Sequence, residues 1–239
     1  MCIACQTFAL PRRSFLALAA AGAAAAATAT LGGQALAAGA TTSVSADEAL
    51  ARLKSGNEKF VSAPQLCAAD LANQRGAIAK AQTPWATIVG CADSRLGPEL
   101  VFGGVGLGEL FVARNAGNMA DTATMGTIEY GAAVLGIPLI VVLGHQRCGA
   151  VKAACAVVDK HEKFPGSIGP MVAAIVPAAR AVHGKPGDFV DNAIRESAKR
   201  TAAKIAKDSK IVAGLVKAKK VKVLAAYYDL DSGKVEYLS

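Results

Sequence analysis

Apolar runs of the length of single strands recur along the chain and predict a central sheet. Residues 86–90 read Ala-Thr-Ile-Val-Gly, and residues 138–144 read Pro-Leu-Ile-Val-Val-Leu-Gly. Continuous apolar stretches of this kind are typical of strands buried on both faces. A shorter strand is expected at 109–113. A last run at 221–229, followed by Asp-Ser-Gly and then residues 234–237, predicts a terminal β-hairpin.

Between these runs the apolar positions recur at helical spacing. Ser45 or Asp47 can cap a helix that starts near residue 46. Further helical segments are expected at about 68–80, 98–102, 122–135, 148–158, 168–182 with an interruption at Pro177, and 189–218. Strands that alternate with helices predict an α/β fold. We expect a mainly parallel central sheet, flanked by helices, with an antiparallel edge strand at the C-terminus.

The N-terminus has the pattern of an export signal. Arg12 and Arg13 precede an alanine-rich apolar run, and a small-residue cleavage site follows at 35–37. Adjacent arginines before Ser-Phe-Leu resemble a twin-arginine signal. We expect a signal peptide at 1–37, a linker at 38–45, and one domain at 46–239 whose helical arm covers 46–81. Such a chain is exported, and the periplasm is the expected destination. An uncleaved anchor and a soluble tail are the alternatives.

After signal removal we expect neither a nucleic acid nor a membrane as a partner, and no other stretch reaches about 18 consecutive apolar residues. The formal net charge of +8 falls to +6 without the leader, which has two arginines and no acid. The remaining excess lies mainly over residues 199–222, a segment rich in Lys and Ala. Aromatic residues are not interleaved with these charges, so solvated helix faces are favoured over a nucleic-acid surface.

Candidate metal ligands follow two of the expected strands. Cys91 directly follows the first run, His145 directly follows the run at 138–144, and Cys148 comes three residues after His145. Thiolates and imidazole are the ligands that zinc prefers, and three of them leave one coordination position open. Adjacent strands would bring the two loops together. Packing is the alternative for each residue alone, and Cys67 and Cys155 are expected to be small buried hydrophobes.

Asp93 and Arg95 lie directly beyond Cys91. Asp93 can accept a hydrogen bond from a ligand on the metal, or bind the metal itself. Arg95 can hold Asp93 in a bidentate pair. A purely structural ion pair within the loop is the alternative.

Together these motifs resemble the β-class carbonic anhydrase family. They are Cys-Ala-Asp-Ser-Arg at 91–95 and Gly-His-Gln-Arg-Cys-Gly at 144–149, with further similarity at 109–118, 128–130 and 227–236. The resemblance covers about residue 80 to the C-terminus. It implies one Zn²⁺ per subunit on Cys91, His145 and Cys148, a catalytic Asp93–Arg95 dyad, and a homodimer or dimer of dimers.

The resemblance also implies a substrate pocket and a reaction. Carbon dioxide would lie against Gln82, Phe111 and Tyr130, with Gln82 reaching across a dimer interface, and the Gly149 amide would orient bicarbonate. The implied reaction is reversible hydration of carbon dioxide to bicarbonate and a proton, by attack of zinc-bound hydroxide. Asp93 would be a fourth zinc ligand in a closed state at lower pH.

Other functions remain open on the same residues. They are hydrolysis of carbonyl sulfide or carbon disulfide on the same fold, a metal-free cysteine hydrolase that uses Cys91 and His145, and a non-enzymatic zinc-binding module. The chain also departs from the family. Residues 102–106 are glycine-rich where relatives often carry Asp-Gln, and Ile88 stands where members with an inhibitory bicarbonate site carry tryptophan. We therefore do not expect that regulatory site.

Overall fold

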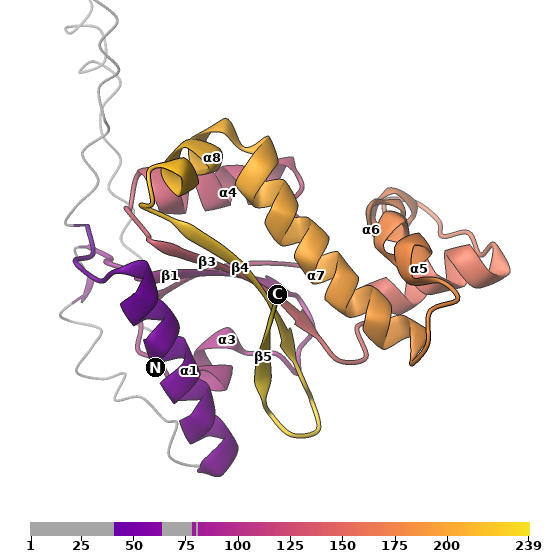
Figure 1. The fold of residues 1–239 in the computed structure, drawn as a ribbon, viewed down its shortest axis with the longest axis horizontal. Coiled ribbons are helices and arrows are strands. Elements are labelled where there is room, and N and C mark those ends of the chain that lie inside the picture. The colour runs from indigo at the N-terminus through magenta and orange to yellow at the C-terminus, as the bar shows by residue number, and fades with distance from the viewer. Residues whose placement is uncertain (1–40, 64–77, 80) are drawn as a thin grey trace, which may run out of the picture. The chain divides into compact units, whose positions relative to one another are not determined.

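The computed structural model describes residues 41–63, 78–79 and 81–239 (Figure 1). The export signal, the helix expected at 68–80 and Cys67 lie outside the described residues. The strands are β1 (Ala86–Cys91), β2 (Leu110–Asn115), β3 (Leu139–His145), β4 (Lys222–Tyr228) and β5 (Val235–Leu238). The helices are α1 (Ala46–Ser62), α3 (Pro98–Val101), α4 (Thr122–Ala133), α5 (Gly149–Lys160), α6 (Ile168–Val182), α7 (Phe189–Asp208) and α8 (Lys210–Lys217).

The five strands form one sheet in the order β2-β1-β3-β4-β5. The pairs β1–β2, β1–β3 and β3–β4 are parallel, and only the terminal β4–β5 pair is antiparallel. This is the predicted α/β fold, with the hairpin at the C-terminal edge. The expected ends of two strands were slightly short: β1 and β3 extend through Cys91 and His145 themselves.

Helices cover both faces of this sheet, and β1 and β3 are therefore buried along their whole length. Successive side chains of a strand point to opposite faces. Accordingly Leu139, Val141 and Leu143 join one apolar cluster, together with residues of α1 and α3. Ile140 and Val142 join another, together with residues of α4, α7 and α8. The unbroken apolar pattern of these strands follows from this double coverage.

Helix α1 packs closely against the end of α3. Ser45 accepts a hydrogen bond from the Glu48 amide and so caps the start of α1, which was one of the two expected caps. A Cβ atom on Gly56 would lie 2.0 Å from the Phe102 carbonyl oxygen, and one on Gly103 would lie 2.7 Å from the Gly56 backbone. Only glycine permits this approach, since no side chain fits between the two backbones.

Two helical predictions were wrong in detail. Pro177 lies inside α6 and does not interrupt it. A proline removes one helical hydrogen bond. Pro177 and Ala173, whose carbonyl loses that bond, are both exposed, so water can replace the missing donor. The single segment expected at 189–218 is instead two helices, because Ser209 leaves the helical conformation and caps α8 through the Val212 amide.

No helix in the part of the chain that the structure describes is both long enough and apolar enough to cross a membrane.

Candidate metal centre

The candidate centre lies where two neighbouring parallel strands end. The connection from β1 leads to β2 on one side, and the connection from β3 leads to β4 on the other. The carboxyl ends of such a strand pair form a topological switch point, where α/β sheets place their ligands. Cys91 is the last residue of β1 and His145 the last of β3. Cys148 is the N-cap of α5.

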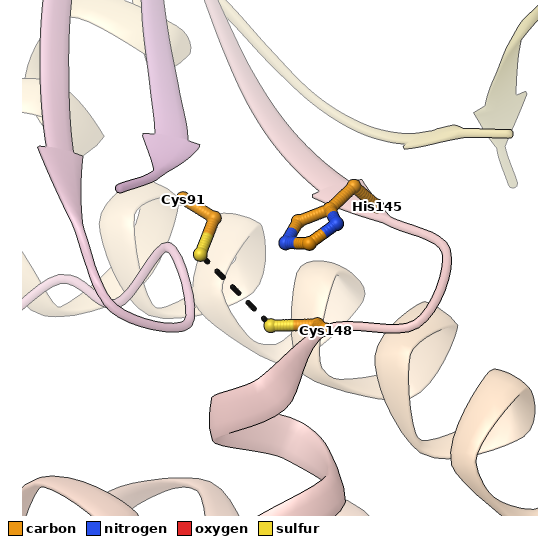
Figure 2. A group of neighbouring side chains, drawn as sticks. All are labelled: Cys91, His145 and Cys148. Atoms are coloured by element: carbon orange, nitrogen blue, oxygen red, sulfur yellow. Dashed lines mark hydrogen bonds between the residues drawn. The ribbon is translucent and has the colours of Figure 1, made fainter. Parts of the chain in front are cut away.

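The three side chains meet at this point (Figure 2). One possible ligand atom from each of Cys91, His145 and Cys148 lies within 4.8 Å of the others, and all three residues are buried. The two Sγ atoms are 3.9 Å apart. Among the described residues, this is the one group of three or more such side chains with metal-site spacing.

The orientation of the imidazole suits a metal ligand. His145 Nδ1 lies 3.0 Å from the Gln146 carbonyl oxygen. A carbonyl can only accept, so Nδ1 carries the proton and donates it, which leaves the Nε2 lone pair free. Nε2 is buried and has no hydrogen-bond partner. An orphaned buried nitrogen is costly in a folded protein, and a metal ion bound there would remove that cost.

The two thiols share one proton. Cys91 accepts the Cys148 hydrogen bond, which lowers the pKa of Cys91 to about 4. The amides of Gly117 and Asp93 act in the same direction, and burial opposes them. The pKa of Cys148 is raised, first by its hydrogen bond to Cys91 and then by burial. Two adjacent thiolates repel in a buried site. A cation would remove that repulsion and make both sulfurs ligands.

Asp93 and Arg95 form the bidentate pair that their spacing allows. Arg95 Nε donates to Asp93 Oδ1 over 2.9 Å, and Nη2 donates to Oδ2 over 2.7 Å. These side-chain bonds hold the pKa of Asp93 well below its usual range, with the Arg95 amide adding to the effect and burial opposing it. Asp93 Oδ2 also lies 3.9 Å from His145 Nε2. The carboxylate is therefore ionised and borders the cluster.

Sequence reasoning missed the role of Arg114 in shaping this loop. Arg114 donates to the Cys91 carbonyl over 2.8 Å and to the Asp93 carbonyl over 2.7 Å. In the same strand-end region, the Gly117 amide donates to Cys91 Sγ over 3.4 Å. The position of residues 114–117 at the carboxyl end of a strand parallel to β1 was the available signal, since parallel strands end at one edge.

The residues expected around the substrate are only partly brought together. Phe111 on β2 and Tyr130 on α4 are neighbours, with ring centroids 6.3 Å apart, and Tyr130 is 47% exposed. Gly149 begins α5 beside Cys148, with open space where a Cβ would lie. Gln82 is exposed ahead of β1. Within one chain, no hydrogen bond or ion pair joins Gln82 to the cluster of Cys91, His145 and Cys148.

The fold and this site define an α/β protein with a buried two-cysteine, one-histidine centre at a sheet switch point. Three protein ligands with an adjacent carboxylate are typical of catalytic rather than structural metal sites.

Comparison with known proteins then identifies the family. Residues 86–235 match the family model described as carbonic anhydrase. A carbonic anhydrase of Mycolicibacterium smegmatis is 36% identical over 187 residues, which cover 78% of this chain and 90% of that protein. The chain belongs to the β-class carbonic anhydrase family.

Solved structures agree in fold. The Coccomyxa β-carbonic anhydrase in complex with acetazolamide superposes with a TM-score of 0.62 at 28% identity, over 79% of this chain and 86% of that one. A tetrameric β-carbonic anhydrase of Sordaria macrospora gives a TM-score of 0.62 at 22% identity, over 70% and 89%.

Proposed function

We propose that this protein is a zinc enzyme that catalyses the reversible hydration of carbon dioxide to bicarbonate and a proton. The observation that carries the proposal is the buried cluster of Cys91, His145 and Cys148, with Asp93 at its border, in a chain of this family. Zinc bound there would supply the Lewis acidity that makes hydroxide available from water, its established part in carbonic anhydrases.

The ligands are suited to zinc for chemical reasons. Two thiolates and one imidazole form a donor set that favours zinc over magnesium or calcium, which prefer oxygen. The bond from His145 Nδ1 to the Gln146 carbonyl fixes the ring so that Nε2 faces the cluster. Cys148 stands at the start of α5, where helix amides favour a thiolate.

Asp93 would be the residue that handles the attacking hydroxide. Its ionised carboxylate can accept a hydrogen bond from the hydroxide and so orient a lone pair toward carbon dioxide. Arg95 keeps that carboxylate ionised and turned toward itself, through two side-chain bonds and one amide bond. If Arg95 released it, Asp93 would be the fourth ligand and the reactive position would close.

The proposed substrate residues do not all lie beside the cluster of one chain, since Phe111 pairs with Thr87, four residues before Cys91 on β1. Phe111 and Tyr130 offer an apolar wall of two neighbouring rings. The amide of Gly149, an exposed residue at the start of α5, would orient bicarbonate. Gln82 would complete the pocket of a second subunit, which is our reason for proposing a homodimer or a dimer of dimers. Light scattering on a size-exclusion column tests that assembly, and a monomer with full activity would contradict it.

The central test pairs metal analysis with stopped-flow hydration of carbon dioxide. We expect one zinc per chain and hydration by the wild type, and retained zinc with strongly reduced hydration in Asp93→Ala. Cys148→Ser should instead lose the metal. Stoichiometric zinc without hydration at any pH would contradict the proposed activity. Wild-type protein that binds no zinc would contradict the metal site itself.

Export remains a separate proposal that rests on residues 12–37 alone. A twin-arginine route carries folded protein, so zinc would be bound before transport. Sequencing the N-terminus of the periplasmic protein tests it, and a chain that begins after Ala37 is expected.

A further inference from the structure

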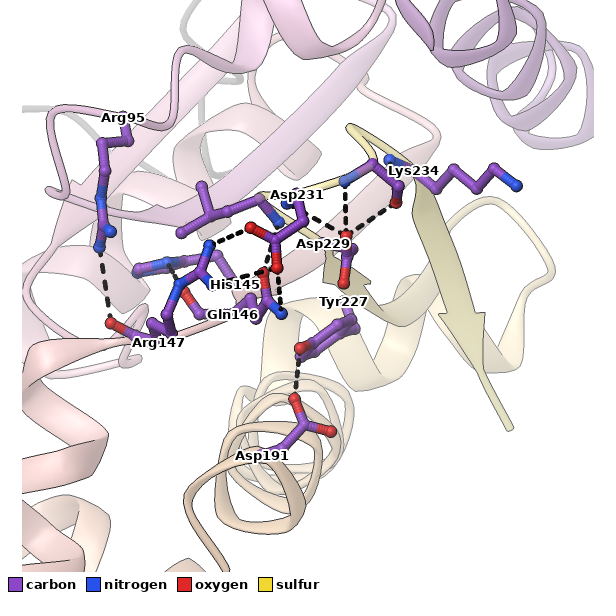
Figure 3. A network of polar contacts seen from close by, with 11 residues as sticks. Arg95, His145, Gln146, Arg147, Asp191, Tyr227, Asp229, Asp231 and Lys234 are labelled. Carbon is purple, nitrogen blue, oxygen red and sulfur yellow. Dashed lines mark hydrogen bonds and ion pairs between the residues drawn. The ribbon is translucent and has the colours of Figure 1, made fainter. Parts of the chain in front are cut away.

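The loop that carries two of the three proposed ligands is tied to the C-terminal hairpin (Figure 3). His145 and Cys148 are separated by Gln146 and Arg147, and both intervening side chains bind Asp231 in the β4–β5 turn. Gln146 Nε2 donates to Asp231 Oδ2 over 3.1 Å. Arg147 donates to Oδ2 over 3.0 Å and to Oδ1 over 2.6 Å. One carboxylate therefore holds both residues that link the two ligands.

Arg147 needs such a restraint because its backbone is in the left-handed region. Its φ is 57°, a conformation that is unfavourable for residues other than glycine. This turn at Arg147 directs the chain from the end of β3 into the N-cap at Cys148. A strained residue persists only where its surroundings hold it, and the bidentate bond to Asp231 is the contact that holds the side chain.

Gln146 transmits the restraint to the imidazole. Its amide donates to the Tyr228 carbonyl over 2.8 Å, and its side-chain oxygen accepts from the Leu230 amide over 3.1 Å. Its own carbonyl accepts the His145 Nδ1 proton. The Gln146 carbonyl thus sets the direction of the ring, and the bonds of Gln146 to β4 and to the following turn hold this residue in place.

The turn presents Asp231 in a defined position. Asp229 Oδ1 accepts the amide of Asp231 over 3.1 Å, and the amide and hydroxyl of Ser232, each over 2.7 Å. These bonds form a local turn of the kind that aspartate side chains stabilise. Among the described residues, the carboxylate of Asp231 bonds to Gln146 and Arg147 of the ligand loop and to no other side chain.

We propose that Asp231 is a positioning residue of the metal centre, acting through Arg147 and Gln146 to keep His145 and Cys148 at ligand spacing. The proposal rests on the proposed function only in that the cluster binds zinc. Arg147 and Asp231 are 54% and 65% exposed. Exposed ion pairs contribute little to stability, so this pair serves the geometry of the loop more than the stability of the fold.

The test compares Asp231→Asn with Glu196→Gln. The control removes a carboxylate from another exposed pair, since Glu196 accepts from Arg200 Nε over 2.7 Å on α7, away from the ligand loop. Zinc release to a chromophoric chelator and the visible spectrum of the cobalt-substituted protein are measured alongside the melting temperature. Neither release nor the spectrum responds to a residue that only supports the fold.

We expect Asp231→Asn to release zinc about tenfold faster, the lower end of what partners of metal ligands contribute. Its cobalt spectrum should change, while its melting temperature stays near that of the wild type. Glu196→Gln should match the wild type in all three. Wild-type release and spectrum in Asp231→Asn would overturn the positioning role while leaving the zinc site standing. A wild type that binds no zinc would overturn both proposals.

Discussion

Two aspartate–arginine pairs flank the metal centre, and they differ in how far apart their members lie in the sequence. Asp93 and Arg95 are two residues apart within one loop, and their bonds close as soon as that loop forms. Arg147 and Asp231 are 84 residues apart and meet only because β4 lies beside β3. Both pairs are bidentate, and both arginines are exposed.

The two ion pairs, which differ in sequence separation, also differ in what they can do at the site. The local pair places a charged oxygen 3.9 Å from His145 Nε2, at the border of the cluster. It can therefore take part in the chemistry. The long-range pair binds the residues between two ligands and lies outside the cluster. It can affect the reaction only through the shape of the loop. In this protein the local pair supplies a carboxylate at the border of the cluster, and the long-range pair holds the loop that sets the spacing of His145 and Cys148.

The largest expected effect comes from Asp93. Asp93→Asn keeps the shape of the side chain but removes the charge, and Asn can donate where the proposed role is to accept. We expect hydration of carbon dioxide, measured as kcat/KM by stopped flow, to fall about a hundredfold or more. Zinc content should not change. Activity within about threefold of the wild type would show that the local pair is only structural.

In the zinc-free protein, the pH dependence of thiol alkylation should differ strongly between Cys91 and Cys155. Cys91, whose pKa is lowered to about 4, is already a thiolate at neutral pH, so its alkylation rate should stay flat between about pH 6 and 8. Burial raises the pKa of Cys155 to about 11, with Asp188 and Asp159 adding to it. Its rate should therefore rise about tenfold per pH unit.

Alkylation with iodoacetamide, followed by peptide mass spectrometry, separates these cysteines. Zinc should protect Cys91 and leave Cys155 unchanged. Equal pH dependence at both positions would contradict the shared proton of the cluster.

Arg95→Lys tests whether the local pair needs its bidentate geometry. Lysine keeps the charge but offers a single donor group in place of the planar fork. We expect about a tenfold loss of hydration activity with normal zinc content, which is less than for Asp93→Asn because the carboxylate itself remains. A loss as large as that of Asp93→Asn would show that Arg95 contributes beyond holding Asp93.

The smallest expected effect separates backbone strain from the ion pair at Arg147. Glycine adopts the left-handed conformation freely and alanine does not. Both variants lose the bond to Asp231, yet Arg147→Ala should melt about 3 °C below Arg147→Gly. Thermal denaturation followed by circular dichroism measures this difference. Equal melting temperatures would mean that the loop changes conformation once the side chain is gone.

Local patterns were enough to predict most of the fold. The apolar runs of β1 and β3, the Asp-Ser-Gly turn before β5 and the cap at Ser45 all depend on neighbours in the sequence. The predictions failed at two helical positions, for two different reasons. Pro177 stays inside α6 because its side of the helix faces water, and Ser209 divides α7 from α8 by bonding to the Val212 amide.

By itself, the sequence determined the types of ligand and their place at strand ends, because residue type and strand periodicity are local properties. It also determined that Asp93 and Arg95 could pair. Only the tertiary structure decided the order β2-β1-β3-β4-β5. That order brings the Cys91 loop beside His145, and the β4–β5 turn beside Arg147. The sequence therefore showed Asp231 only as a turn residue and not as a partner of the ligand loop, since contacts between distant residues exist only after the strands have paired.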